Sequence, residues 1–348
     1  MKKTILACLL VIAAGVCAAD VPRTPLPVAV TLSDIVPIVR AVGGDLVAPF
    51  AVMPSGSDPH SFSVSAEIVQ RVRSAALIVF ANTSFLSFEE RLKHDLPGVP
   101  SVDWPEYEAY GARLLDFPGL ARNPHGFWLD HVNGRAIAGA VANALVERGA
   151  PSEVITSNLL RFVEELEAAH ATGRALADEA GLTGDTLVAV VPGVAYVVQN
   201  VGAVVGDILL PDEGTSGVNA AKLESVARKL HAKEARGIVC PLSMKEAKPG
   251  QAARQLAEDT GSRVIYVRFL SAGDGEGSYL SQAYYNAAML TRKPCAEASA
   301  LSGKTPPALV SLVVLGIVVL ALVFLLVRER RGKRAPEGRG IFDEERGS

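Results

Sequence analysis

Short apolar segments alternate with amphipathic helical patterns along this chain, and that alternation constrains the fold more than any other feature. The pattern occurs twice, before and after a charged helical run that extends from Ser152 to about Ala180. Buried strands that alternate with helices are typical of parallel sheets with helices outside. We therefore predict an α/β fold of two parallel-sheet lobes, joined by one helix of roughly 25 residues and about 40 Å.

The expected elements follow from the period of the apolar residues and from the glycines that end helices. In the first lobe, strands are predicted at 26–33, 46–52 and 75–82, and helices at 34–44, 65–75 and 134–149. In the second lobe, strands are predicted at 186–191, 205–210, 235–240 and 262–269, and helices at 221–234, 246–261 and 279–293.

Both ends of the chain are strongly apolar. Residues 1–19 combine Lys2 and Lys3 with a short apolar run and small residues, which is typical of a cleaved secretory signal peptide. A retained signal anchor and a lipid attached to Cys17 are the alternatives. Residues 307–327 carry no charge and are long enough to cross a bilayer as a helix, and the basic segment RERRGKR follows directly.

The position of those basic residues predicts the orientation of the chain. Positive charge stays on the cytoplasmic side of a membrane, so we expect a single-pass membrane protein with an extracellular body and a cytoplasmic tail. The predicted parts are a signal peptide at 1–19, an N-terminal lobe at 20–150, a linking helix at 151–182, a C-terminal lobe at 183–295, a linker at 296–306, a transmembrane helix at 307–327 and a tail at 328–348.

Charge and cysteine content bound the possible partners and the redox environment. The formal net charge is −3 and the body between the two apolar ends has no basic stripe, which argues against a nucleic-acid partner. Beyond the predicted signal peptide, the only cysteines are Cys240 and Cys295. Two cysteines in an exported domain are a candidate disulfide, and two free thiols are the alternative.

Two Pro-His turns carry the most informative chemistry. His60 lies between a predicted strand and a predicted helix, in the segment PSGSDPHSFSVS, and His125 lies in the segment NPHGFWLDH, also before a helix. Ligands of parallel sheets bind beyond the carboxyl ends of the strands, and a neutral imidazole is a good ligand for zinc. Each histidine alone fits a surface or capping residue, but together they predict a cleft in which two imidazoles bind a divalent metal ion.

These motifs also carry a resemblance. The DPH at 58–60, the PH at 124–125, the WLD at 128–130 and the YLSQAYYN of the last predicted helix resemble the zinc/manganese-binding solute-binding proteins of ABC importers. The similarity covers about residues 27–295. It implies two α/β lobes joined by one long rigid helix, with one metal ion in the cleft, and the two histidines correspond to the family's first two ligands.

At the other two ligand positions the sequence departs from the family pattern. The resemblance implies a His or Glu at the position of Val191 and an acidic residue near Leu270, where the segment VRFLSA has no carboxylate. We expect Asp274 and Glu276, in the GDGEG segment that follows, to complete the metal site. The acidic pair of the PDEGTSG segment is the alternative.

The resemblance implies a membrane-anchored extracellular substrate-binding protein that captures zinc or manganese for an ABC importer. The expected partners are an ABC permease and its ATPase, and the metal is the transported ligand, with zinc ahead of manganese because imidazole suits zinc. The alternative is a metal-poor receptor or scaffold on the same fold, with a degenerate metal site. An extracellular metallohydrolase has only the two histidines in its favour. We expect no enzyme activity, because the sequence has no GxxxxGK[ST], HExxH or GxSxG motif.

Overall fold

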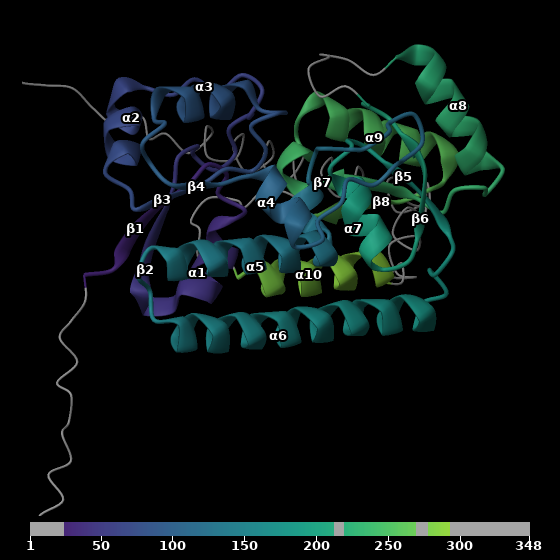
Figure 1. Ribbon diagram of the computed structural model, residues 1–348. Helices are drawn as coiled ribbons and strands as arrows, with labels where there is room; N and C mark the ends of the chain where they lie inside the picture. The colour runs from purple at the N-terminus through teal and green to yellow at the C-terminus, as the bar shows by residue number, and fades with distance from the viewer. Residues whose placement is uncertain (1–23, 212–218, 269–277, 293–348) are drawn as a thin grey trace, which may run out of the picture. The chain divides into compact units, whose positions relative to one another are not determined.

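The computed structural model describes residues 24–211, 219–268 and 278–292 (Figure 1). The predicted signal peptide, linker, transmembrane helix and tail lie outside these residues, as do Leu270, Asp274 and Glu276. Within the described segments, no helix has both the length and the apolar character that a membrane crossing needs. The predicted span at 307–327 therefore concerns residues that the structure does not describe.

Two parallel sheets of four strands form the two lobes. In the N-terminal lobe the order is β2-β1-β3-β4, with β1 at Leu26–Val30, β2 at Val47–Ala51, β3 at Leu77–Val79 and β4 at Ser101–Val102. In the C-terminal lobe the order is β6-β5-β7-β8, with β5 at Thr186–Ala189, β6 at Val204–Ile208, β7 at Ile238–Pro241 and β8 at Val264–Val267. Every pairing between these strands is parallel, which confirms the predicted α/β fold of two parallel-sheet lobes.

Helices connect the strands and cover the sheets. In the N-terminal half they are α1 at Val36–Gly43, α2 at Ala66–Arg73, α3 at Ser87–Asp95, α4 at Trp104–Ala109, α5 at His131–Glu147 and α6 at Ser152–Glu179. In the C-terminal half they are α7 at Val194–Asn200, α8 at Ala220–His231, α9 at Lys248–Thr260 and α10 at Tyr279–Thr291. Short 3₁₀ turns occupy Gly44–Leu46, Phe127–Leu129 and Leu242–Met244.

Strand β1 shows why the strands are apolar on both faces. Val28 and Val30 point into the large core that also contains α1 and α5. Ala29, between them, joins a second cluster with Val72 of α2 and Leu92 of α3. Because successive strand residues face opposite sides, a sheet with helices on both faces needs continuous apolar strands rather than alternating ones.

The two sheets have the same strand order, and this order decides where a ligand can bind. In each lobe the chain leaves the first strand toward one edge of the sheet and later returns to pair on the other side, so the first strand marks a switch point. Adjacent loops diverge at such a point and leave a crevice beyond the carboxyl ends of the strands. The switch points lie between β1 and β3 in one lobe and between β5 and β7 in the other.

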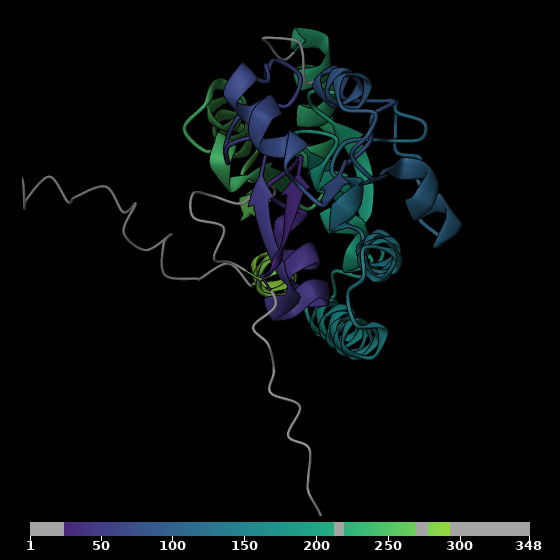
Figure 2. The ribbon, with the colours of Figure 1, turned by 60° about the vertical axis from the view of Figure 1, so that its left-hand side comes forward.

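Helix α6 joins the two lobes. It has 28 residues, so it is about 42 Å long at the standard rise. Its buried residues form one stripe that faces α1, α5 and α10: Ile155, Phe162, Leu166, Ala169, Gly173 and Ala177. Figures 1 and 2 show α5 and α10 beside α6, below the sheets. The long linking helix expected from the sequence is therefore present, and α10 reinforces it.

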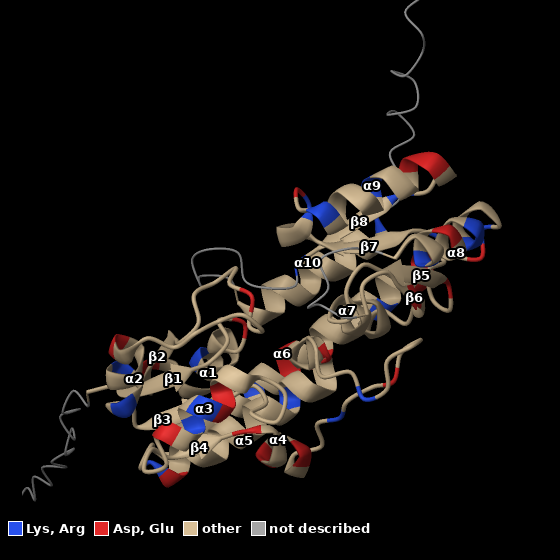
Figure 3. Cartoon of the chain, turned by 90° about the horizontal axis from the view of Figure 1, so that it is seen from above, with Lys and Arg blue, Asp and Glu red and all other residues tan. Residues whose placement is uncertain are grey.

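Positions of Lys and Arg and positions of Asp and Glu are mixed along the described helices and loops (Figure 3). On α3, Glu90 and Arg91 are adjacent, and on α8 Lys222 and Glu224 are two positions apart. This interspersed pattern agrees with the small net charge of the sequence.

The turn after β3 is held by a buried carboxylate. Glu89 of α3 is fully buried, and its two oxygens accept hydrogen bonds from the backbone N–H groups of Ala81 (2.9 Å) and Asn82 (2.8 Å). Burial raises the pKa of Glu89 from 4.5 to about 7, although hydrogen bonds, first from Thr31 and then from the two backbone groups, lower it. This carboxylate sets the path of the chain toward Phe85, at the mouth of the crevice.

The raised pKa predicts a stability that depends on pH. Between about pH 4.5 and 7 the folded protein keeps a proton on Glu89 that the unfolded chain releases, so the free energy of unfolding should fall as the pH rises. A difference from 4.5 to about 7 corresponds to about 3 kcal/mol over that window, and the fall should level off above it. Urea unfolding at several pH values measures this.

Glu89→Gln should flatten the pH dependence, whereas Glu90→Gln, at the exposed neighbouring position, should leave it unchanged. If Glu89→Gln keeps the full slope between pH 4.5 and 7, a different group is responsible. The variants are compared by the slope of the free energy of unfolding against pH. The absolute stability is not compared, because Gln at position 89 also places an amide NH₂ against backbone donors and lowers stability at every pH.

Candidate metal centre

A cleft of about 310 Å³ lies at the carboxyl ends of the strands of both lobes. From the N-terminal lobe it is lined by Leu32 after β1, His60 after β2 and Phe85 after β3. From the C-terminal lobe it is lined by Ser243 and Met244, which follow β7. The cleft therefore lies at the switch point of the N-terminal sheet and beyond the carboxyl end of β7, in the kind of place where parallel sheets bind ligands.

The two predicted histidines meet in this cleft. The ring centres of His60 and His125 are 5.5 Å apart, and the rings are tilted by 51°. Two imidazoles bound to one zinc at about 2.0–2.1 Å in tetrahedral geometry have ring centres about 5 Å apart. Phe85 contacts both rings edge-on, with its centre 5.2 Å from that of His60 and 4.6 Å from that of His125. The spacing of the imidazoles thus suits a shared metal ion.

Asn123 fixes the tautomer of His125. The Asn123 amide nitrogen donates to the carbonyl oxygen of Pro192 (3.0 Å), so the amide oxygen Oδ1 must face the other way, toward His125. That oxygen lies 3.0 Å from the backbone nitrogen and 3.1 Å from Nδ1 of His125. An amide oxygen only accepts, so the ring proton is on Nδ1 and the lone pair of the neutral ring is on Nε2. Hydrogen bonds of this kind orient metal-binding histidines.

His60 is held by its own loop. Asp58 accepts a hydrogen bond from the backbone N–H of His60 (2.9 Å) and another from the hydroxyl of Ser61 (3.0 Å), which closes an Asx turn. Gly56 begins this turn with φ 77°, a conformation that side chains disfavour. His60 is exposed and His125 is half-buried, so the first imidazole is on the solvent side of the pair.

Tyr196 of the C-terminal lobe locks the His125 loop from the other side. Its hydroxyl donates to the carbonyl oxygen of Asn123 (2.6 Å) and accepts from the backbone N–H of Leu115 (3.1 Å). Burial raises the pKa of Tyr196 well above its ordinary value, so the hydroxyl keeps its proton and can donate. Together with the hydrogen bond from Asn123 to Pro192, the bond from Tyr196 gives Asn123 two contacts with the C-terminal lobe.

A further contact between the lobes is made through Trp128, which lines the cleft. The indole nitrogen of Trp128 donates to the carboxylate of Asp34 (3.2 Å), which is buried at the carboxyl end of β1. The hydroxyl of Tyr279, at the start of α10, donates to the carbonyl oxygen of Trp128. The WLD segment therefore connects the cleft loop to the last helix.

The other predicted site residues have different outcomes. Val191 is buried directly after β5, beside Pro192, so an apolar side chain occupies the position that the resemblance assigns to the third ligand. Asp274, Glu276 and the acidic pair of PDEGTSG lie outside the described residues.

Sequence reasoning assigned no role in the cleft to several of the described residues, among them Phe85, Asn123 and Asp34. Asn123 directly precedes the Pro-His pair, which was the available signal. Phe85 and Asp34 each follow a strand, and no sequence motif apart from that position indicates a role in the cleft.

Cys240 is fully buried in β7 as a free thiol, and burial raises its pKa to about 12. Its predicted partner Cys295 lies outside the described residues. The Cys240–Cys295 disulfide therefore stays a prediction.

Asn123→Ala should lower the free energy of unfolding by about 3 kcal/mol, because it leaves buried donors and acceptors without partners. Asn143→Ala removes an exposed asparagine of α5 whose amide nitrogen donates to Glu147 (2.9 Å) on the helix surface, and should change stability by less than about 0.5 kcal/mol. Urea denaturation of both variants measures the difference. Equal effects of the two substitutions would contradict the role given to Asn123.

Comparison with known proteins identifies related chains. Residues 28–293 match a family model described as the periplasmic component A of the zinc-uptake complex. The chain is similar to the solved solute-binding protein FpvC of Pseudomonas aeruginosa in complex with Ni²⁺, with 21% identity, a TM-score of 0.65, and coverage of 77% of this chain and 96% of that one. No curated protein matches the chain.

Two further solved structures have the same fold. TroA, a periplasmic zinc-binding protein of Treponema pallidum, is 18% identical, with a TM-score of 0.65 and coverage of 77% of this chain and 98% of that one. A Cd-bound periplasmic metal-binding protein of Candidatus Liberibacter asiaticus is 15% identical, with a TM-score of 0.64 and coverage of 76% and 98%. At these identities the likeness establishes a shared fold.

Proposed function

The chain belongs to the family of the periplasmic component A of zinc-uptake complexes, and from this membership we propose that it captures a divalent metal ion for an ABC importer. The ion is bound between the lobes by His60 and His125. The observation that carries the proposal is the pair of imidazoles, with ring centres 5.5 Å apart in a cleft lined by both lobes. The matching family and the similar structures are binding proteins, and this chain is not an enzyme.

Zinc is the preferred ion in this proposal. Imidazole nitrogen is a good ligand for zinc, whereas manganese favours carboxylate and water. FpvC is solved in complex with Ni²⁺ and with Mn²⁺, the Liberibacter protein is solved bound to Cd, and TroA is described as a zinc-binding protein. A site with two imidazoles and few carboxylates is expected to discriminate among such ions by ligand softness more than by charge.

Asp274 and Glu276 are proposed as the remaining protein ligands. Transported or structural zinc usually has four ligands, and Val191 supplies none. The proposal therefore needs carboxylates or water at two positions, and the GDGEG segment comes after β8 in the sequence. Binding is expected to be weaker and less selective than at a site with four protein ligands.

Titration of zinc into the purified chain by calorimetry tests this site. His60→Ala and His125→Ala should each weaken binding at the cleft at least tenfold, which is about 1.4 kcal/mol, because a single imidazole remains. His94→Ala is the matched control, since His94 lies on α3 with 87% of its side chain exposed. Asp274→Asn and Glu276→Gln should weaken binding by a smaller factor.

Two results would contradict the proposal. If neither cleft histidine affects zinc binding, the ion is bound elsewhere. If the cleft binds no divalent ion at micromolar concentration, the chain is the metal-poor scaffold that the valine at position 191 favours.

The proposed partners are an ABC permease and its ATPase, and a membrane tether is part of the proposal. The tether rests on the sequence: 21 uncharged residues at 307–327 precede the basic segment RERRGKR. Protease added to intact cells should remove the body and spare an epitope on the tail at 328–348. Loss of the tail epitope in intact cells would reverse the proposed orientation.

A further inference from the structure

A second group of metal-ligating side chains lies outside the cleft. Ring nitrogens of His131 and His170 and a carboxylate oxygen of Glu167 lie within 4.8 Å of one another, and all three residues are half-buried. We infer that His131, Glu167 and His170 form a second divalent-cation site, which binds a borderline ion such as zinc. Two imidazoles and one carboxylate are a known zinc ligand set, with one position left for water. The inference is independent of the proposed function of the cleft.

The backbone brings these ligands together on rigid elements. Glu167 and His170 are three residues apart on α6, so they lie on the same face of that helix. His131 is the first residue of α5, and the preceding Asp130 caps this helix by accepting from the backbone N–H groups of Val132 (2.9 Å) and Asn133 (3.2 Å). Ligands on helices are positioned more precisely than ligands on loops.

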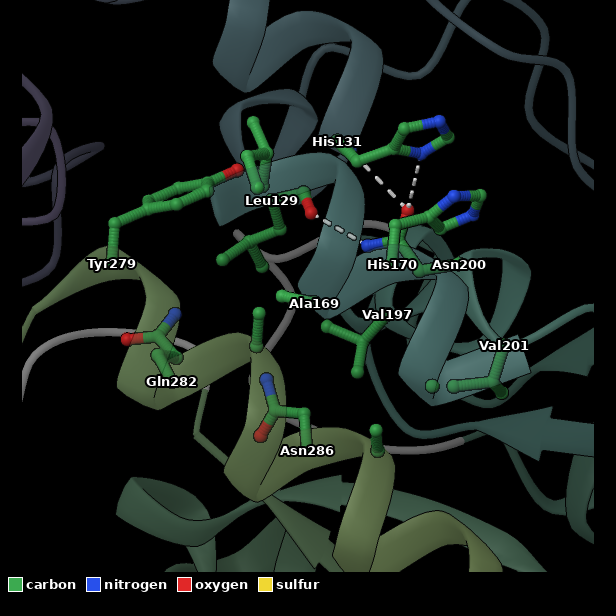
Figure 4. Close-up of a pocket in the computed structure, with 14 residues that line it drawn as sticks. Leu129, His131, Ala169, His170, Val197, Asn200, Val201, Tyr279, Gln282 and Asn286 are labelled. Carbon is green, nitrogen blue, oxygen red and sulfur yellow. Dashed lines mark hydrogen bonds between the residues drawn. The ribbon is translucent and has the colours of Figure 1, made fainter. Parts of the chain in front are cut away.

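An asparagine orients His131 in the same way that Asn123 orients His125. The amide nitrogen of Asn200 donates to the carbonyl oxygen of Leu129 (2.7 Å), so its amide oxygen faces His131 (Figure 4). That oxygen is 3.3 Å from both the backbone nitrogen and Nδ1 of His131. The proton of the His131 ring is therefore on Nδ1, and the lone pair on Nε2 is the ligand atom.

The two imidazoles are already close together. The rings of His131 and His170 stack with centres 3.5 Å apart and planes within 10°. Burial, and next the neighbouring His131, lower the pKa of His170. The ligand atoms around tetrahedral zinc are about 3.3 Å apart. Side-chain rotations that move the ligand atoms by about an ångström or more bring the three atoms to that spacing around an ion.

The space beside the histidines fits an ion. His131, His170 and Asn200 line a cavity of about 40 Å³ between α5, α6, α7 and α10, whose remaining wall is largely apolar (Figure 4). A water molecule needs about 10–15 Å³ on this measure, so the cavity has room for an ion with a water. Leu166 and Val197 belong to the apolar wall beside the two histidines, whereas Glu167 lies outside the cavity lining and pairs with Arg135 (3.3 Å), an ion pair that a bound cation replaces.

The position of the site gives it a structural role. Through its ligands an ion joins the start of α5 to α6, and through Asn200 it is connected to α7 of the C-terminal lobe. His131 also ends the segment that carries His125. A cation here should therefore stabilise the junction of the lobes without belonging to the transported cargo.

The test separates the two sites. The double variant His60→Ala/His125→Ala of the full chain should still bind one zinc per chain, measured by equilibrium dialysis with elemental analysis. In its ¹H–¹⁵N imidazole spectrum, zinc should shift the signals of His131 and His170 and leave those of exposed His94 unchanged. Adding Glu167→Gln or His170→Gln to the double variant should weaken this remaining binding at least tenfold, whereas adding His94→Gln should not.

The outcomes are distinguishable from failure of the cleft site. If the cleft binds no ion, wild type still binds one zinc, which His170→Gln removes and His60→Ala does not. The inference is overturned if zinc at tens of micromolar leaves the His131 and His170 signals of the double cleft variant unmoved. It is also overturned if both His170→Gln and Glu167→Gln leave the bound zinc unchanged. The spectrum of the folded double variant decides the question even if a third substitution impairs folding.

Discussion

The arrangement of the cleft depends on the hydrogen bonds of one fully buried residue, Asn123. Its amide nitrogen binds Pro192 of the C-terminal lobe, its amide oxygen binds the backbone and ring of His125, and its carbonyl oxygen accepts from Tyr196. Each bond restricts the others, because a flip of the Asn123 amide would place its NH₂ group against His125 and break the hydrogen bond to Pro192. In a buried setting an unpaired polar group is costly, so the network is formed as a whole. The position of one lobe and the tautomer of one imidazole are thereby linked.

The rest of the fold brings the two lobes to that contact. Each sheet has its first strand at the switch point, so the loops that diverge from the carboxyl ends of both sheets can face a common cleft. Helix α6 extends under both lobes, and its single apolar stripe is shared by α5 from one side and α10 from the other. Residues of both lobes belong to one continuous core. The cleft is thus a consequence of parallel topology, while its residues are a matter of loop sequence.

The sequence predicted the elements whose pattern is long and locally consistent, and it missed those that depend on distant contacts. The repeated apolar strands, α5 and the 28-residue α6 have clear periods. Helix α7 has the sequence VAYVVQN, in which β-branched residues resemble a strand, and only burial against the sheet decides in favour of helix. Strand β4 has two residues, too few for any period. Likewise His60 and His125 were found because each follows a Pro in a loop, whereas the partners of Asn123 and His131 lie 69 residues away in sequence, at Pro192 and Asn200.

Those two distant partners also imply how the metal centre responds to motion of the lobes. Pro192 precedes α7 of the C-terminal lobe and Asn200 ends it, while His125 and His131 flank one short segment of the N-terminal lobe. Each of these two imidazoles faces an amide oxygen whose amide nitrogen donates to a backbone carbonyl. If the C-terminal lobe moves away, Asn123 loses its bond to Pro192 but keeps the bond that its amide oxygen accepts from the backbone N–H of His125 in the same lobe. We therefore expect separation of the lobes to loosen Asn123 without releasing His125, whereas His131 loses the amide of Asn200, which belongs to α7.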